Sequence, residues 1–578
     1  MPGITAPGAI AAQRSYGPLI WDVIAALIGF GVVLVLGETS ASLVEPLKEL
    51  ELAPVALDPS HLPAYAARTT LRMLVALALS LLFTFTYATL AAKSRRAELL
   101  LVPLLDILQS VPILGFISVT VVFFMSLAPG KVLGAEFAAI FAIFTSQAWN
   151  MAFSFYQSLR TVPRDLDEAA QSMRLTAWMK FWRLEVPFAT PGLVWNMMMS
   201  MSGGWFFVVA SEAISVGNTT VTLPGIGSYI ALAIEKRDLS AVGWAIGTMA
   251  IVILIYDQLL FRPLVAWADR FRPEQQPGVA PPTSWVLTAF QRSNLVRAAL
   301  RPLTKPWEAT FRLSLTLPAW AHAKRSVQRR DRIINAAWLA MLGLGMAYTI
   351  WSIIRFVVPA ISMQEVGMVV TLSAITLLRV VVLIALASLI WVPVGIVVGL
   401  RPTLTRMVQP IAQFLAAFPA NLFFPLAVVF IVTYKLNPDV WLSPLMILGT
   451  QWYVLFNVIA GAAVMPRELL DAGASFHVRG WAWWRNVALP AVFPYYLTGA
   501  ITASGGSFNA SIVSESVSWG QDKLLAHGIG AYIAEATAKG DFQRIVLGIT
   551  IMSTFVVILN RSLWRPLYRW AETRFRLD

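Results

Sequence analysis

The sequence predicts an all-α polytopic membrane protein with about 12 transmembrane helices, arranged as two tandem six-helix units. Of its 578 residues, 57% are hydrophobic and only 13% are charged, whereas about 25% of the residues in a soluble domain are charged. Apolar runs long enough to cross a hydrocarbon layer of about 30 Å recur along the whole chain. The second half of the chain also repeats the first.

Twelve apolar runs are expected to form the transmembrane helices, six in each half. The first six lie near residues 18–37, 69–92, 99–127, 134–157, 188–216 and 239–261. The second six lie near residues 334–357, 367–400, 408–433, 440–463, 491–518 and 543–563. Pro112 and Pro419 occur inside the third run of each half and are expected to kink those helices.

A repeat with a nearly constant offset relates the two halves. An offset of 307 places Arg72 on Arg379, and further along the chain an offset of 303 places Trp149 on Trp452. Six is an even number of spans, so both halves would cross the membrane in the same orientation, related by a pseudo-twofold axis along the membrane normal. We expect a transported solute to pass along that axis.

The repeat and the charge distribution divide the chain into three segments. Residues 1–271 form the first unit, residues 272–333 a basic linker and residues 334–578 the second unit. The linker holds eleven Lys or Arg against three acidic residues, whereas residues 37–67 hold five acidic residues against one lysine. Because basic loops remain on the cytoplasmic side, the linker and both chain termini are predicted to be cytoplasmic. The net charge of +13 therefore reflects membrane orientation, and the expected contact is membrane lipid, not nucleic acid.

The residue inventory argues against a reaction carried out by the chain itself. It contains no cysteine, and its four histidines are far apart in the sequence, so no metal site is expected. It also lacks the Gly-x-x-x-x-Gly-Lys-Ser/Thr loop that binds nucleotide phosphates. We therefore expect no cofactor bound by this chain.

A matched 25-residue segment lies between the fourth and fifth spans of each half, at residues 163–187 and 466–490. Each segment begins and ends with proline and carries acidic and small residues near its start. Proline is tolerated at the start of a helix, acidic residues suit the positive end of the helix dipole, and small residues leave a face for close contact. The pattern predicts a short amphipathic helix that docks on a partner.

The two segments resemble the EAA loop of ABC-importer permeases, in which a coupling helix sits in a groove of the ATP-hydrolysing subunit. Glu168-Ala169-Ala170 matches the motif outright, and Asp471-Ala472-Gly473 matches it by residue type. The resemblance implies a coupling role for Asp167, Glu168, Ala169, Ala170, Ser172, Asp471, Ala472, Gly473 and Ser475. Where the family has a glycine some residues later, this chain departs from the pattern with Arg174 and His477.

The resemblance covers most of each half and looks most like permeases for nitrate, taurine and alkanesulfonates, in the duplicated form described as anion-transport permeases. It implies two tandem ABC type I importer permease units in a bacterial cytoplasmic (inner) membrane. It also implies import of a small anion, with two copies of an ABC ATPase subunit that carry ATP and Mg²⁺ and with an extracytoplasmic substrate-binding protein. The chain would then be a transport subunit and not an enzyme.

Charged and aromatic residues inside the predicted spans are candidates for the translocation path or gate. Arg72, Glu212, Arg379 and Glu515 lie near the outer ends of their spans, where an ionisable group is costly unless it is paired or hydrated. They either form ion pairs within each half, Arg72 with Glu212 and Arg379 with Glu515, or line the path. Trp149 and Trp452 recur at equivalent depth, and packing is the favoured interpretation for both.

Two other classes of protein are compatible with parts of the pattern. A secondary transporter could also have twelve spans in two parallel halves, but it would not require a matched cytoplasmic segment after the fourth span of each half. A membrane-embedded enzyme would need clustered catalytic groups inside the bilayer, and the sequence shows none. The sequence leaves the identity of the solute open.

Overall fold

The computed structural model describes residues 55–110, 112–129, 131–216, 219–271, 283–298 and 328–574, together with a few isolated positions. Most of the first predicted span, residues 18–37, and much of the predicted linker, residues 272–333, lie outside the described residues. The N-terminus, which was predicted to be cytoplasmic, lies outside them as well.

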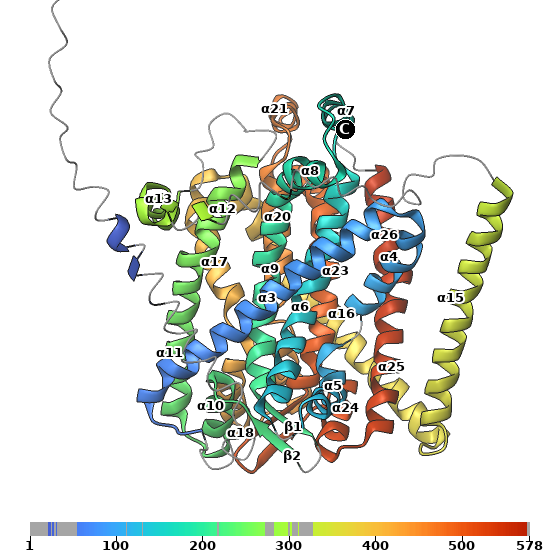
Figure 1. The fold of residues 1–578 in the computed structure, drawn as a ribbon. Helices are drawn as coiled ribbons and strands as arrows, with labels where there is room; N and C mark the ends of the chain where they lie inside the picture. Colours follow the sequence, from blue (N-terminus) through green and yellow to red (C-terminus); the bar gives the residue numbers. More distant parts are fainter. Residues whose placement is uncertain are drawn as a thin grey trace, which may run out of the picture.

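Long apolar helices dominate the described chain (Figure 1). Eight of these helices are long and apolar enough to cross a membrane, and two bent helix pairs raise the number to ten if each pair is one span. The helices that make up the membrane spans of the first half are α3 (Leu62–Lys93), α4 (Arg95–Ser110), α5 (Ile113–Leu127), α6 (Val132–Arg160), α9 (Val186–Glu212) and α11 (Leu239–Tyr256). Those of the second half are α15 (Gln328–Val357), α16 (Met363–Gly399), α17 (Pro402–Ala417), α18 (Phe424–Thr433), α20 (Gln451–Ala463), α23 (Leu489–Ser514) and α25 (Phe542–Leu559).

Other helices connect these spans. In the first half they are η2 (Pro59–His61), α7 (Arg164–Ser172), α8 (Ala177–Lys180), η3 (Phe181–Glu185), α10 (Ile226–Glu235), η4 (Asp257–Phe261), α12 (Arg262–Ala268) and η5 (Asp269–Phe271), followed by α13 (Trp285–Arg292) in the linker. In the second half they are η7 (Ala420–Phe423), α19 (Pro438–Trp441), η8 (Ser443–Met446), α21 (Arg467–Ser475), α22 (Gly480–Trp483), η9 (Trp484–Ala488), α24 (Ile529–Lys539), η10 (Asn560–Trp564) and α26 (Arg565–Arg574). The π-helical turns η3 and η9, and likewise η4 and η10, occupy equivalent positions of the repeat.

The third span of each half is broken, as the two prolines predicted. In the first half α4 ends just before Pro112 and α5 begins just after it, and in the second half the chain bends by 75° around Pro419. Proline has no N–H to donate, and its ring clashes with the preceding helical turn. The span expected over 440–463 is also bent, because α19, η8 and α20 form a pair of segments at an angle of 43°.

Two short antiparallel hairpins depart from the predicted all-α architecture. Strand β1 (Ala213–Val216) pairs with β2 (Thr219–Thr222), and β3 (Ser516–Trp519) pairs with β4 (Asp522–Leu525). Each hairpin follows a fifth span, so these spans each end four residues earlier than the predicted 216 and 518. Figure 1 shows β1 and β2 at the end of the bundle opposite to α7 and α21.

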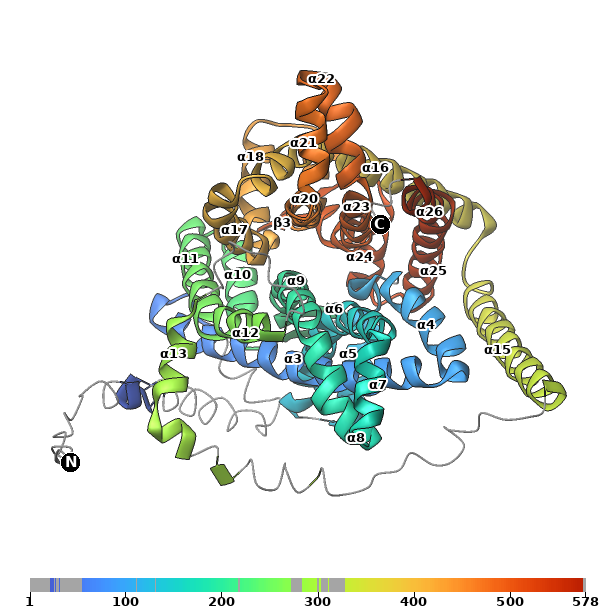
Figure 2. The ribbon, with the colours of Figure 1, turned by 90° about the horizontal axis from the view of Figure 1, so that it is seen from above.

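The halves pack against each other through their broken third spans. Helix α5 contacts α23, α24 and α25 of the second half, while α17 and η7 contact α9 and α11 of the first. Viewed along the bundle axis, the first half and the second half lie on opposite sides of the molecule (Figure 2). Hydrogen bonds across this interface stabilise both breaks. The N–H of Ile113, at the start of α5, donates to Asn509 Oδ1 at 2.6 Å, and Asn421 Nδ2 donates to the carbonyl oxygen of Phe206 at 3.2 Å.

Helix α15 stands at the edge of the bundle (Figures 1 and 2). None of the residues in its most apolar stretch is buried within the chain. In a bilayer, lipid tails cover such an apolar surface.

Candidate functional site

The helices α7 and α21 project from the same end of the bundle (Figure 1). Glu168, Ala169 and Ser172 on α7 are exposed, as are Asp471 and Ser475 on α21, while Asp167 and Ala472 are half-buried. The residues that face their own half are Ala170 and the equivalent Gly473, and both are buried. Most of the predicted coupling residues are therefore accessible to a partner.

Both helices end in a Schellman motif that requires a left-handed residue. Leu175 N–H donates to the Ala170 carbonyl, and the equivalent Val478 N–H donates to the Gly473 carbonyl. The intervening residues, Arg174 with φ of 52° and His477 with φ of 54°, both adopt positive φ. This is the conformation that glycine adopts without strain. Both turns therefore adopt the left-handed conformation although neither has a glycine at that position.

An exposed apolar side chain lies at the C-terminal end of each of these helices. Met173 is 73% exposed, and the equivalent Phe476 is 81% exposed. Each side chain is therefore available for contact with a partner. The offset of 303 aligns the two positions, but neither carries a charge or a motif that marks it in the sequence.

Ion pairs anchor α7 to the body of the first half. Asp167 pairs with Lys180, and Glu185 Oε2 lies 2.8 Å from Lys93 Nζ at the end of α3. The hydrogen bond from Lys180 lowers the pKa of Asp167 below its usual value. Charged contacts therefore link α7 to α8, to η3 and to the end of α3.

The second half replaces these charges with apolar side chains. At the positions equivalent to Lys93, Asp167 and Lys180 it has Leu400, Leu470 and Trp483, and all three pack in or against one hydrophobic cluster. The fourth charged residue, Glu185, is matched by the fully buried Ala488. The two projecting helices thus have similar outer surfaces but different anchors.

A buried ionic network joins four helices at the opposite end of the first half. Arg72 of α3 donates to Glu212 at 2.6 Å and makes two bonds of 2.6 Å to Glu136 of α6. Glu212 also accepts from Thr69 Oγ1 at 2.7 Å and from the N–H of Gly227 in α10 at 2.6 Å. The ion pair expected between Arg72 and Glu212 is confirmed, and it fixes α10 to α3, α6 and α9.

The second half repeats this network in a looser form. Arg379 lies 3.2 Å from Glu515 and 2.8 Å from Asp439, and Glu515 accepts from Thr376 Oγ1 at 2.8 Å and from Gly530 N–H at 2.7 Å. The ion pair between Arg379 and Glu515 is thus confirmed as well. Sequence reasoning missed Glu136 and Asp439, although the offset of 303 places one acidic residue on the other.

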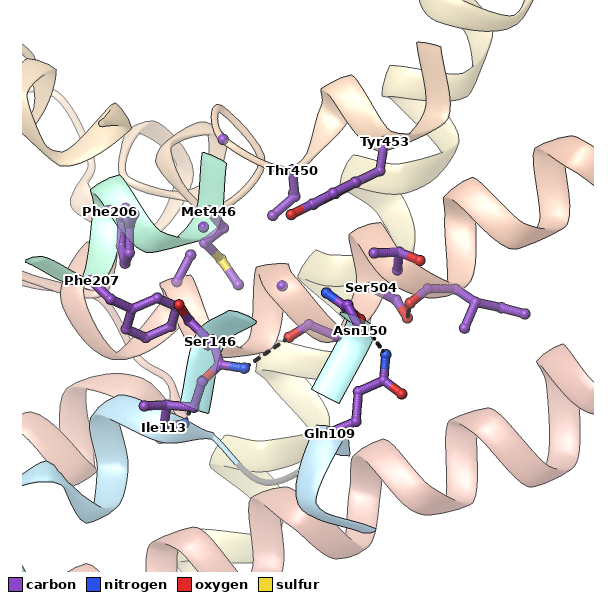
Figure 3. Close-up of a pocket in the computed structure, with 18 of the residues that line it drawn as sticks. Gln109, Ile113, Ser146, Asn150, Phe206, Phe207, Met446, Thr450, Tyr453 and Ser504 are labelled. Carbon is purple, nitrogen blue, oxygen red and sulfur yellow. Dashed lines mark hydrogen bonds between the residues drawn. The ribbon is translucent and has the colours of Figure 1, made fainter. Parts of the chain in front are cut away.

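A cavity lies between the two halves beside the breaks in α4–α5 and α17–η7 (Figure 3). Its walls come from α4, α5, α6 and α9 of the first half and from residues 416–453, α23, α25 and η10 of the second. Trp149 lines this cavity, and Trp452 lines a neighbouring one that shares Tyr453 with it. The four charged path candidates, Arg72, Glu212, Arg379 and Glu515, line neither cavity and instead form the networks described above.

Contacts between the halves close the hairpin end of the bundle. Arg237 lies 2.8 Å from Asp522 at the β3–β4 turn, and the N–H of Gly520 donates to the Ile234 carbonyl at 2.9 Å. These contacts join the end of α10 and the loop after it in one half to the hairpin of the other. Among the described residues, no cluster of three or more metal-binding side chains occurs.

The sequence matches the family model described as "Binding-protein-dependent transport system inner membrane component" twice, over residues 84–262 and 392–577. The two matches fall in the two halves and each includes one projecting helix.

Individual relatives match a smaller part of the chain. The chain is 29% identical over 187 residues to the bicarbonate transport system permease protein CmpB of Synechococcus elongatus, covering 32% of this chain and 63% of the relative. It is 24% identical over 187 residues to the nitrate import permease protein NrtB of Leptolyngbya laminosa, with the same coverage. It is 26% identical over 275 residues to the putative aliphatic sulfonates transport permease protein SsuC of Bacillus subtilis, covering 47% of this chain and 89% of the relative. The chain thus spans less than two thirds of the first two relatives.

Proposed function

The chain belongs to the family of binding-protein-dependent transport system inner membrane components, and from that premise we propose that it forms the complete membrane channel of an ATP-driven importer. The observation that carries the proposal is the pair of equivalent projecting helices, α7 and α21, each ending in an exposed apolar side chain. Because both helices belong to one chain, two ATPase subunits would dock on one permease polypeptide.

The partners proposed for the chain follow from its architecture. Each ATPase subunit binds ATP and Mg²⁺ and receives one projecting helix in a groove, with Met173 or Phe476 as the apolar contact. This end of the bundle, which also carries α26 (Figure 1), is then cytoplasmic. An extracytoplasmic substrate-binding protein would dock at the hairpin end. The chain performs no chemistry of its own and converts the closure of the ATPase dimer into movement of its halves.

The transport cycle we propose is a rocking of one half against the other around the central cavity. The hairpin-end contacts, Arg237 with Asp522 and Gly520 with Ile234, hold the outer side closed in this conformation. They must separate when the outer side opens. The Arg72 and Arg379 networks lie within single halves, so they keep each half rigid during that movement.

We propose a small oxyanion as the solute. The relatives named above carry bicarbonate, nitrate or aliphatic sulfonates according to their names. These three solutes share a compact negatively charged head with oxygen acceptors.

Co-purification tests the proposed coupling. The tagged chain is isolated from its native membrane, and bound proteins are identified by mass spectrometry. An ATPase subunit should accompany the wild-type chain and be lost when Glu168 and Asp471 are both changed to lysine. The matched control is Glu235→Lys, an exposed charge reversal at the hairpin end, which should retain the ATPase. A chain that purifies alone and still transports would instead be a secondary carrier.

A further inference from the structure

The central cavity straddles the pseudo-twofold axis of the repeat. Equivalent positions from the two halves face each other across it, such as Asn150 of α6 and Tyr453 of α20, or Phe206 of α9 and Asn509 of α23. A solute that moves along the axis must therefore pass these side chains.

The matched positions differ in chemistry, which gives the cavity two unlike walls. In Figure 3, Phe206, Phe207 and Met446 lie on one side, and Gln109, Asn150 and Ser504 lie on the other. Ser146 also lies on the side of Phe207, but its hydroxyl donates to the Ile143 carbonyl of its own helix at 2.6 Å. The apolar wall therefore offers mainly dispersion contacts, whereas the polar wall offers amide and hydroxyl groups. A ligand that fits both walls has a polar head and an apolar remainder.

Unused donors point into the polar side of the cavity. Gln109 Nε2 donates to Asn150 Oδ1 at 2.7 Å, which fixes the orientation of the Asn150 amide. Within the part of the chain that the structure describes, neither the Asn150 N–H groups nor the Tyr453 hydroxyl donates to a protein acceptor. Polar groups beside a cavity that lack a protein partner are satisfied by water or by a ligand.

The described lining residues include no Lys, Arg, Asp or Glu. Neutral N–H and O–H donors solvate the oxygens of an anion, and the absence of carboxylates avoids repulsion. The absence of a cation keeps binding weak enough for release, as a transport path requires.

We propose that this cavity is a solute-binding site for a small organic anion, with its oxygen-bearing head on Asn150 and Tyr453 and its apolar part against Phe206, Phe207 and Met446. The proposal rests on the proposed function and narrows it, because an inorganic oxyanion would leave the apolar wall without a ligand.

Equilibrium dialysis of the purified chain with its co-purifying ATPase tests the site, with 1-butanesulfonate as the probe. Nitrate and sulfate serve as anions without an apolar part, and tetramethylammonium serves as a cation of opposite charge. The wild-type chain should bind 1-butanesulfonate more tightly than the other three. Equal or tighter binding of nitrate, sulfate or tetramethylammonium would overturn the proposal, and so would an absence of 1-butanesulfonate binding.

Asn150→Asp is the decisive variant. The aspartate Oδ1 still accepts from Gln109, but the N–H donors are replaced by a negative charge, so binding of 1-butanesulfonate should weaken at least about tenfold. The matched control is Gln157→Glu, which adds the same charge at an exposed position of the same helix and should stay within about twofold of wild type, because an exposed charge is screened. Phe206→Ala should reduce the affinity for 1-butanesulfonate and leave that for nitrate unchanged.

Unchanged binding in Asn150→Asp would refute the site. Recovery of the ATPase in the same preparation tests the proposed coupling separately. The solute site and the coupling role can therefore be refuted independently of each other.

Discussion

Replacing Glu212 with glutamine should destabilise the protein more than the equivalent replacement of Glu515. In the first half the Arg72 side chain is only 4% exposed, and its bond to Glu212 is 2.6 Å long. In the second half the Arg379 side chain is 13% exposed, and its bond to Glu515 is 3.2 Å long. Its other partner, Asp439, is one-third exposed, so water reaches the second network more readily.

The magnitudes follow from these environments. Replacing Glu212 leaves Arg72 paired with Glu136, so the cost comes from the buried hydrogen bonds that Glu212 accepts, and each donor left without an acceptor costs about 1–3 kcal/mol. The glutamine would also place an N–H group among donors, since the Glu212 carboxylate accepts from Thr69 and Gly227 as well as from Arg72. We expect Glu212→Gln to cost about 3–5 kcal/mol and Glu515→Gln to cost about 1–3 kcal/mol.

Unfolding of the purified chain in mixed micelles, titrated with a denaturing detergent and followed by circular dichroism, measures both losses. Glu235→Gln is the control, since Glu235 is exposed at the same end of the bundle and should change stability little. If Glu515→Gln costs as much as Glu212→Gln, or if Glu212→Gln costs less than about 1 kcal/mol, the assigned role of the buried network is wrong.

Three further predictions concern the projecting helices. Arg174→Gly and His477→Gly should each stabilise the chain by about 1 kcal/mol, because each removes a left-handed non-glycine residue, and a loss of stability in the same detergent titration would contradict the Schellman assignment. The pKa of Asp167 lies below its usual value because Lys180 donates to it. The stabilising ion pair is therefore fully present above the unfolded pKa of about 4 and is lost only as the pH falls through the lower folded pKa. ATPase recovery should not change between about pH 6 and 8 through this group, whereas Asp167→Asn should reduce recovery in co-purification at every pH. Met173→Ser and Phe476→Ser should each lower recovery of the ATPase without changing the detergent midpoint, and full recovery in the double variant would show that the two side chains do not contact the partner.

The arrangement of the spans could be predicted from the sequence because its signals are long and repeated. Apolar runs set the helices, and the offset between Trp149 and Trp452 established that the two halves are homologous. Pro112 and Pro419 marked the breaks in the third spans, since proline interrupts the helical hydrogen bonds. The bend in the fourth span of the second half lies inside one apolar run, so the apolar pattern does not reveal it.

The finer parts of the site had weaker signals. Glu136 and Asp439 lie on helices that are separate in sequence from Arg72 and Arg379, so only the folded chain reveals their pairing. The hairpins span four residues per strand and follow apolar helices without a break, so periodicity does not separate them. The cavity is lined by neutral side chains such as Asn150, which stand out in no composition or charge pattern.

Site-directed cross-linking from the two projecting helices tests the central claim most directly. The natural chain contains no cysteine, so Ser172→Cys and Ser475→Cys each introduce a unique thiol at equivalent exposed positions. Ser518→Cys on the exposed face of β3 is the control at the other end of the bundle. A thiol-reactive cross-linker applied in native membranes should join both helix variants, but not the control, to an ATPase subunit identified by mass spectrometry. An ATPase cross-linked equally to Ser518→Cys, or to neither helix, would contradict the claim that α7 and α21 are the coupling elements.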